Sequence, residues 1–175
     1  PAVNSIYNIS NKIEIAANVT DTFGVSTVLA NVSYPNGTIN QLTLSNATTH
    51  DDKFNVSFTA PALLGIYNIT FIANDSSNNL NTTETTNFTV NDVLSPTIDF
   101  VSPTTSSGNF ALDSIWANVS SYDLGGLDTV ILSLYNSTEL VGTVSSSSGS
   151  LFNNFTSLTD GTYYLNASAN DTSGN

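Results

Sequence analysis

Apolar and polar residues alternate along most of this chain, which is the pattern of half-buried β-strands. Ile13, Ile15, Ala17 and Val19 occupy every second position of one such stretch. The same alternation predicts further strands at residues 28–34, 42–44, 54–58, 67–73, 88–90, 98–100, 115–119, 130–134, 140–144 and 163–169. One more strand contains Phe152 and Phe155, and its pattern leaves open which of the two faces inward. No helical period runs for a useful length, so the pattern predicts an all-β fold of antiparallel strands.

One stretch of sequence occurs twice. Residues 65–79 return as residues 161–175, and each copy has a turn glycine, an alternating strand and an Asx-type turn. This repeat has a shift of 96, and Ile115 to Val119 repeat Ile15 to Val19 with a shift of 100. A period of this size is typical of one β-sandwich module. Two tandem antiparallel β-sandwiches are therefore predicted, over residues 1–93 and 94–175.

The two copies of the repeat continue differently. Residues 80–90 extend the first copy into one more strand, whereas the second copy reaches Asn175. The second module is therefore predicted to lack its last strand in cis, which leaves unpaired backbone N–H and C=O groups along one edge. Two explanations are open: the chain is a window from a longer tandem array, or a strand from a neighbouring copy fills the edge by donor-strand complementation.

The first ten residues are a candidate for such a donor strand. They place Val3, Tyr7 and Ile9 on one face of an extended segment. The alternative is that these residues begin the first module in cis, because residues 103–112 hold the same place before the second module.

The densest motif is Asn-x-Ser/Thr, the acceptor sequence for N-glycosylation. A half-buried strand also produces polar-apolar-polar triplets without any sugar, so polar face filling is the alternative. Ten of the fifteen motifs lie in the first module and five in the second. The candidate glycosylation sites are Asn8, Asn18, Asn31, Asn36, Asn46, Asn55, Asn68, Asn74, Asn81, Asn87, Asn118, Asn136, Asn154, Asn166 and Asn170.

The second module has large side chains at positions predicted to face outward. Trp116 takes the place of Ala16, while Ile131 and Tyr135 have the opposite parity to Val130, Leu132 and Leu134. Tyr164 is the outward neighbour of Tyr163, which is predicted to serve the core with Tyr67. The outward residues are candidates for contacts between copies, unless loops or a missing strand cover them.

Carboxylates gather in the predicted turns, where they have turn-forming chemistry of their own. Asp92 lies between the modules, as calcium-binding residues do in cadherin-like arrays, with Asp21 and Glu84 as additional oxygens. Plain turns are the alternative, because calcium takes six to eight oxygens and the linker offers few. No other cofactor is expected.

Charge and composition exclude several classes of function. The chain has 2 Lys plus Arg against 14 Asp plus Glu, for a net charge of −12, which argues against binding nucleic acid or anionic lipid. No apolar run approaches the length of a membrane helix, and there is no cysteine. His50 is the only histidine and no nucleophile motif accompanies it, so no enzyme activity is expected.

Several segments together resemble archaeal surface-layer and surface-filament glycoproteins. These are Ala17 to Val25, Tyr34 to Thr38, the two Gly-x-Tyr…Ala-Asn-Asp-x-Ser copies and the closing Phe88 to Val90. The resemblance implies immunoglobulin-like modules in an extracellular, glycosylated cell-surface protein that assembles with copies of itself into a filament or lattice. The second module departs from the pattern at residues 121–127 and in its missing closing strand. The alternative function is an adhesin stalk or cell-surface binding module.

Overall fold

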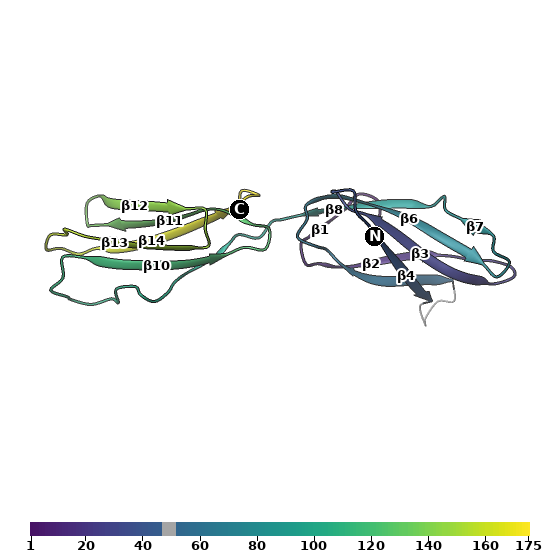
Figure 1. Ribbon diagram of the computed structural model, residues 1–175, viewed down its shortest axis with the longest axis horizontal. Helices are drawn as coiled ribbons and strands as arrows, with labels where there is room; N and C mark the ends of the chain where they lie inside the picture. The colour runs from purple at the N-terminus through teal and green to yellow at the C-terminus, as the bar shows by residue number, and fades with distance from the viewer. Residues whose placement is uncertain (47–51) are drawn as a thin grey trace. The chain divides into compact units, whose positions relative to one another are not determined.

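The computed structural model describes residues 1–46 and 52–175, which form two compact units, Pro1–Asp92 and Val93–Asn175 (Figure 1). Every regular element of the described residues is a β-strand. Within these residues no helix is long and apolar enough to cross a membrane.

The described residues of the first unit form eight strands. They are β1 (Ser5–Asn8), β2 (Lys12–Asn18), β3 (Val25–Ser33), β4 (Ile39–Asn46), β5 (Lys53–Thr59), β6 (Gly65–Asp75), β7 (Leu80–Asn81) and β8 (Thr85–Asn91). Hydrogen bonds connect them in the order β1-β8-β6-β3-β4-β5-β2, with β7 beside β6. β4 pairs with both β3 and β5, so it links the two layers of the sandwich. One pairing is parallel, that of β1 with β8, which the expectation of a purely antiparallel unit did not include.

The core of the first unit follows directly from the alternation. Ile13 and Ile15 of β2, Val32 of β3, and Tyr67 of β6 are almost completely buried. Aromatic rings fill the centre: Tyr67 stacks on Phe88 with ring centroids 5.0 Å apart, and Phe58 meets Phe88 at 6.0 Å. These pairs stabilise the sandwich beyond the area that they remove from water.

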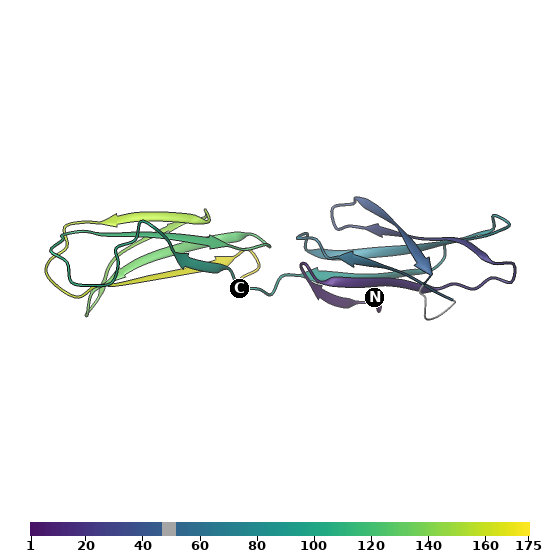
Figure 2. The same cartoon turned by 90° about the horizontal axis from the view of Figure 1, so that it is seen from below.

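The second unit contains six strands in two sheets. They are β9 (Thr97–Phe100), β10 (Ile115–Tyr122), β11 (Leu127–Tyr135), β12 (Leu140–Ser146), β13 (Ser150–Phe155) and β14 (Tyr164–Asp171). One sheet has the order β13-β10-β9 and the other the order β12-β11-β14 (Figures 1 and 2). All of these pairings are antiparallel.

Fewer side chains close the core of the second unit. Ala117, Val119, Val130, Leu132 and Leu134 are buried, together with Phe155. Phe155 is 8% exposed and Phe152 is 52% exposed, so the structure decides the parity of β13 that the sequence left open.

Equivalent hydrogen bonds occur in the turns of both units, and they show which residues of one unit correspond to which residues of the other. The backbone N–H of Ser76 donates to Gly24 O in the first unit, and that of Thr172 donates to Gly126 O in the second. Asp21 accepts from Phe23 N as Asp123 accepts from Gly125 N. β2 and β10 therefore correspond with a shift of 102, whereas the shift expected from sequence was 100. The difference is even, so each side chain keeps its predicted face.

Candidate functional site

The outer edge of β14 distinguishes the second unit from the first. β6, the counterpart of β14, pairs with β3 on one side and with β8 on the other. Among the described residues β14 pairs only with β11. The second side of β14 therefore has no partner strand among the described residues, and its backbone groups are of the kind that binds another strand.

The turn after β14 shows that this edge matches that of β6 residue by residue. The backbone N–H of Asn79 donates to Asp75 Oδ1 at 2.8 Å, and that of Asn175 donates to Asp171 Oδ1 at 2.9 Å. Both turns therefore end at equivalent residues, with a shift of 96. In the first unit the next residue is Leu80, from which the chain returns as β8.

The cores of the two units differ beside these strands. Tyr67 and Ile69 of β6, which pairs with β8, are fully buried, whereas their counterparts Tyr163 and Leu165 are only partly buried. The segment before β10 also differs: residues 101–114 form no strand, and Phe110 and Leu112 are 52% and 63% exposed. In the first unit the corresponding segment forms β1, which pairs with β8.

Both units have a tyrosine that ties the strand to the loop before it. Tyr67 Oη donates to Leu63 O at 2.7 Å, and Tyr163 Oη donates to Thr159 O at 2.8 Å. This is the tyrosine corner of immunoglobulin-like sandwiches. The structure therefore confirms that these tyrosines serve the core at a sheet corner.

The predicted contact residues of the second unit lie on the outer faces of its two sheets. Tyr135 pairs directly with Tyr164 across β11 and β14, and Ile131 lies on the same face. Ile131 and Tyr135 are each 38% exposed and Tyr164 is 58% exposed. Trp116 lies on the outer face of the other sheet and is 50% exposed. Their role in contacts between copies stays a prediction.

The first ten residues act in cis. β1 runs parallel to β8, the ring of Tyr7 meets Phe88 edge-on at 5.8 Å, and Ile9 is 2% exposed. Tyr7 and Ile9 therefore belong to the core of the first unit, which is the cis alternative that the sequence left open. Val3 is 62% exposed and is the one member of that set on the surface.

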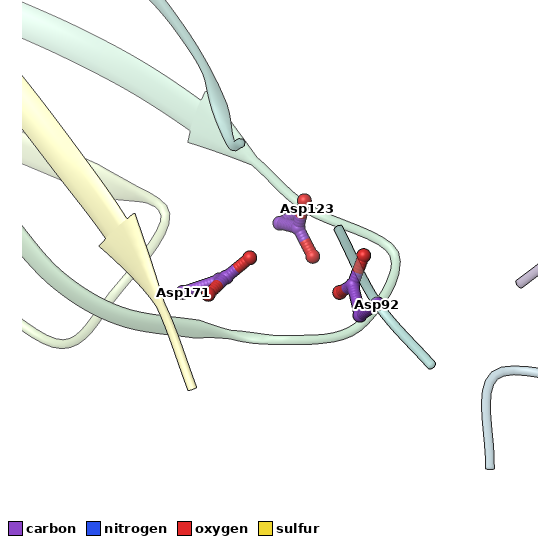
Figure 3. A group of neighbouring side chains, drawn as sticks. All are labelled: Asp92, Asp123 and Asp171. Atoms are coloured by element: carbon purple, nitrogen blue, oxygen red, sulfur yellow. The ribbon is translucent and has the colours of Figure 1, made fainter. Parts of the chain in front are cut away.

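The structure contains one group of three neighbouring carboxylates among its described residues. Oxygens of Asp92, Asp123 and Asp171 lie within 4.8 Å of one another, and Figure 3 shows the side chains pointing together. Asp21 and Glu84, the expected partners of Asp92, are not in this group: Asp21 caps its own turn and Glu84 is exposed. Asp123 and Asp171 were missed because their turns are remote from Asp92 in sequence.

The group offers oxygen ligands of the kind that a hard cation such as Ca²⁺ takes. Asp171 and Asp123 also cap turns, accepting hydrogen bonds from Ser173 and Asn175 and from Gly125 and Gly126. The only basic side chains of the sequence, Lys12 and Lys53, belong to the first unit. Three carboxylates supply fewer oxygens than calcium needs, so calcium binding stays a prediction.

Hydrogen bonds shift the acidity of the two equivalent turn carboxylates. The Asn79 side-chain amide holds the pKa of Asp75 below its usual value, with help from the backbone N–H groups of Asn79 and Ser77. Burial raises the pKa of Asp171, but the hydrogen bonds from Asn175, Ser173 and Gly174 together lower it by more.

The Asn79→Ala variant is expected to raise the pKa of Asp75. A carboxylate with a lowered pKa stabilises the folded state above its unfolded pKa of about 3.9, and that contribution is lost as the pH falls through the folded pKa. The variant should therefore lose less stability than the parent between neutral pH and pH 3. Titration of the Asp75 carboxyl carbon by NMR measures the shift. Ser77→Ala is the matched control, because it keeps the donating backbone N–H, and an equal shift in both variants would contradict the prediction.

None of the fifteen glycosylation motifs has a fully buried asparagine. The asparagines differ, however, in whether the side-chain amide is hydrogen-bonded to another residue. Asn118 Nδ2 donates to Ser102 O at 3.0 Å, and Asn55 Nδ2 donates to Glu14 Oε1 at 2.6 Å. The structure thus separates motifs whose amide is engaged from motifs whose amide faces solvent, which the sequence pattern did not do.

Two shallow hollows lie on the surface of the first unit. One, of about 240 Å³, is lined by residues that include Asp21, Asp52 and Phe54, and the other, of about 460 Å³, by Val3 and residues of β6 and β8. Phe54 is the single aromatic residue among these linings, so neither hollow has the stacked rings of a sugar-binding site. His50 lies outside the described residues.

The strand order defines the class of both units. β9, β10 and β13 match strands A, B and E of an immunoglobulin-like sandwich, and β12, β11 and β14 match C′, C and F. The first unit adds β8 in the place of strand G. The chain is therefore built of immunoglobulin-like β-sandwiches, and residues 93–175 supply strands A, B, C, C′, E and F of the second.

Comparison with known proteins found no matching protein-family description and no matching curated protein. Fibronectin(III)-like modules of Clostridium thermocellum CbhA have 18% identity and a TM-score of 0.40, with 99% of this chain and 84% of that chain covered. A tetra-tandem repeat from the extending region of a large adhesion protein has 20% identity and a TM-score of 0.48, with 99% and 45% covered. The D00–D0 domain of intimin has 13% identity and a TM-score of 0.35, with 99% and 92% covered. Because these identities and TM-scores are low, the assignment to the immunoglobulin-like class rests on the strand pairing alone.

Proposed function

We propose that this chain is a structural segment of an extracellular cell-surface filament or lattice, in which copies join through strand complementation at β14 or through the outer faces of their sheets. Two features support the proposal: among the described residues β14 pairs only with β11, and Ile131, Tyr135 and Tyr164 are exposed on the outer face of the same sheet. Exposed strand edges bind further strands because every backbone N–H and C=O gains a partner.

The surface of the chain supports an extracellular location and a coat of N-linked glycans. Fifteen acceptor motifs have asparagines at or near the surface, while charged residues make up only 9% of the sequence. Such a surface needs neutral polar groups or sugars to stay in solution. The outer-face group of Ile131, Tyr135 and Tyr164 would supplement the strand contact with a sheet-face contact between copies.

The experiment compares the chain with a variant that closes its own edge. A copy of residues 80–91 is joined directly after Asn175, because in the first unit these residues directly follow Asn79, the counterpart of Asn175. We expect the parent chain to form polymers in electron micrographs and light scattering, and the self-closed variant to stay monomeric. A matched control carries asparagine at the copied positions of Phe88 and Val90 and should still polymerise.

A parent chain that stays dispersed at high concentration, with the β14 edge in solvent, would overturn the assembly proposal. Dispersed stalks that bind a carbohydrate or a second cell would instead support the adhesin or binding-module function. Sheets and filaments are both compatible with assembly, and the micrographs distinguish them directly.

A further inference from the structure

The outer face of the β10–β13 pair carries two exposed aromatic rings beside two glycosylation motifs. Trp116 lies directly opposite Asn154, and Asn118 lies directly opposite Phe152. Trp116 also precedes Asn118 by two residues, and Phe152 precedes Asn154 by two, so each ring shares its face with both asparagines. The rings are 50% and 52% exposed.

The two asparagines differ in their freedom to accept a sugar. Asn118 Nδ2, the atom to which a sugar would be joined, donates to Ser102 O at 3.0 Å, and Asn118 Oδ1 is buried. The backbone of Asn118 is also held, since its N–H donates to Thr104 Oγ1 and its carbonyl accepts from Val101 N. Asn154 is exposed and its side-chain amide makes no hydrogen bond to another described residue. Asn154 is therefore the accessible acceptor of this pair.

The spacing places both rings within reach of a sugar on Asn154. Directly opposite residues of an antiparallel pair have Cβ atoms about 5 Å apart, and residues two apart on one strand are separated by about 7 Å. A pyranose ring is about as large as the space between such neighbours, and its C–H face packs against aromatic rings as other apolar groups do. Such packing would remove part of the exposed surface of both rings from solvent, so no partner protein is needed to cover them.

We propose that Asn154 carries an N-linked glycan whose first sugar packs on Trp116 and Phe152. The proposal rests on the glycan coat of the proposed function, and it names one glycosylated asparagine and the two aromatic rings that its sugar contacts. It assigns Trp116 to a contact within the glycoprotein in place of a contact between copies. It also assigns Phe152 a role that the sequence interpretation missed; the signal was the aromatic residue two positions before a glycosylation motif.

The first experiment maps occupancy in the full chain, secreted by a host that N-glycosylates its exported proteins. Mass spectrometry of glycopeptides should show Asn154 occupied and Asn118 empty. An empty Asn154 beside occupied motifs elsewhere would overturn this inference and leave the glycan coat intact. A chain without sugar at any motif would overturn both.

The second experiment uses the fluorescence of Trp116, the single tryptophan of the sequence. A sugar over one face of a half-exposed ring roughly halves its accessible area, so Asn154→Gln should raise the acrylamide quenching constant about twofold. Thr156→Ala, which removes the motif but keeps Asn154, should do the same. Asn166→Gln, which removes an exposed motif on the other sheet, should change nothing.

The Phe152→Ala variant tests whether the sugar packs on both aromatic rings. With a glycan still on Asn154, the variant should give a quenching constant between those of the parent and Asn154→Gln, because the sugar then packs on Trp116 alone. Equal quenching in the parent, Asn154→Gln and Phe152→Ala, with Asn154 occupied in the parent, would overturn the proposed packing. That outcome would leave both the glycan coat and the assembly through β14 standing.

Discussion

A copy of residues 80–91 joined directly after Asn175 is expected to raise the free energy of unfolding of the second unit by about 2 kcal/mol. In the first unit Phe88 and Val90 are fully buried, and Phe88 lies opposite Tyr67 in the β6–β8 ladder. With the shift of 96, the copied phenylalanine falls opposite Tyr163. Burying a Phe and a Val is worth about 3 to 6 kcal/mol, and ordering the new strand offsets part of this gain.

Denaturant unfolding followed by Trp116 fluorescence measures this effect, because the single tryptophan lies in the second unit. The control fusion with asparagine at the copied positions of Phe88 and Val90 should gain little. Equal stability of the two fusions would contradict the idea that an apolar strand completes this core. The partly buried Tyr163 and Leu165 should become protected from solvent only in the apolar fusion.

Phe88→Ala is expected to lower the free energy of unfolding of the first unit by about 3 to 5 kcal/mol, which is enough to unfold many domains of this size. The ring is completely buried and contacts the rings of Tyr7, Phe58 and Tyr67. Its removal leaves a cavity at the centre of the aromatic cluster and loosens β1, whose one partner strand in the described part of the chain is β8.

Scanning calorimetry should show the transition of the first unit at a lower temperature, while the transition reported by Trp116 stays in place. Phe23→Ala is the matched control, since this ring is 80% exposed and its loss should change stability by less than about 0.5 kcal/mol. A similar effect of both substitutions would show that the Phe88 cluster does not hold the first unit together.

Much of the fold follows from local pattern. Period-two alternation places Ile15, Val32 and Val119 inward, and all three are fully buried. The duplicated stretch also predicted that the turns after β6 and β14 are equivalent, and Asp75 and Asp171 accept the same hydrogen bonds in the two copies. These predictions succeed because each needs only the neighbours of a residue along its own strand.

The candidate sites depended on contacts between distant segments. The sequence did not pair Asp92 with Asp123 and Asp171, since three separate turns bring them together. It also offered the first ten residues as a donor strand, whereas β8 holds them in cis. Register across strands and the packing of loops are non-local, so alternation along one strand carries no information about them.

Sequence patterns were enough to establish a repeated all-β chain with outward polar faces and many glycosylation motifs. The folded arrangement was needed to find that Asn154 lies beside Trp116 and Phe152 with an exposed side chain, whereas the amide of Asn118 is hydrogen-bonded to Ser102. The difference arises because hydrogen-bonding partners across a sheet come from chain segments far apart in sequence.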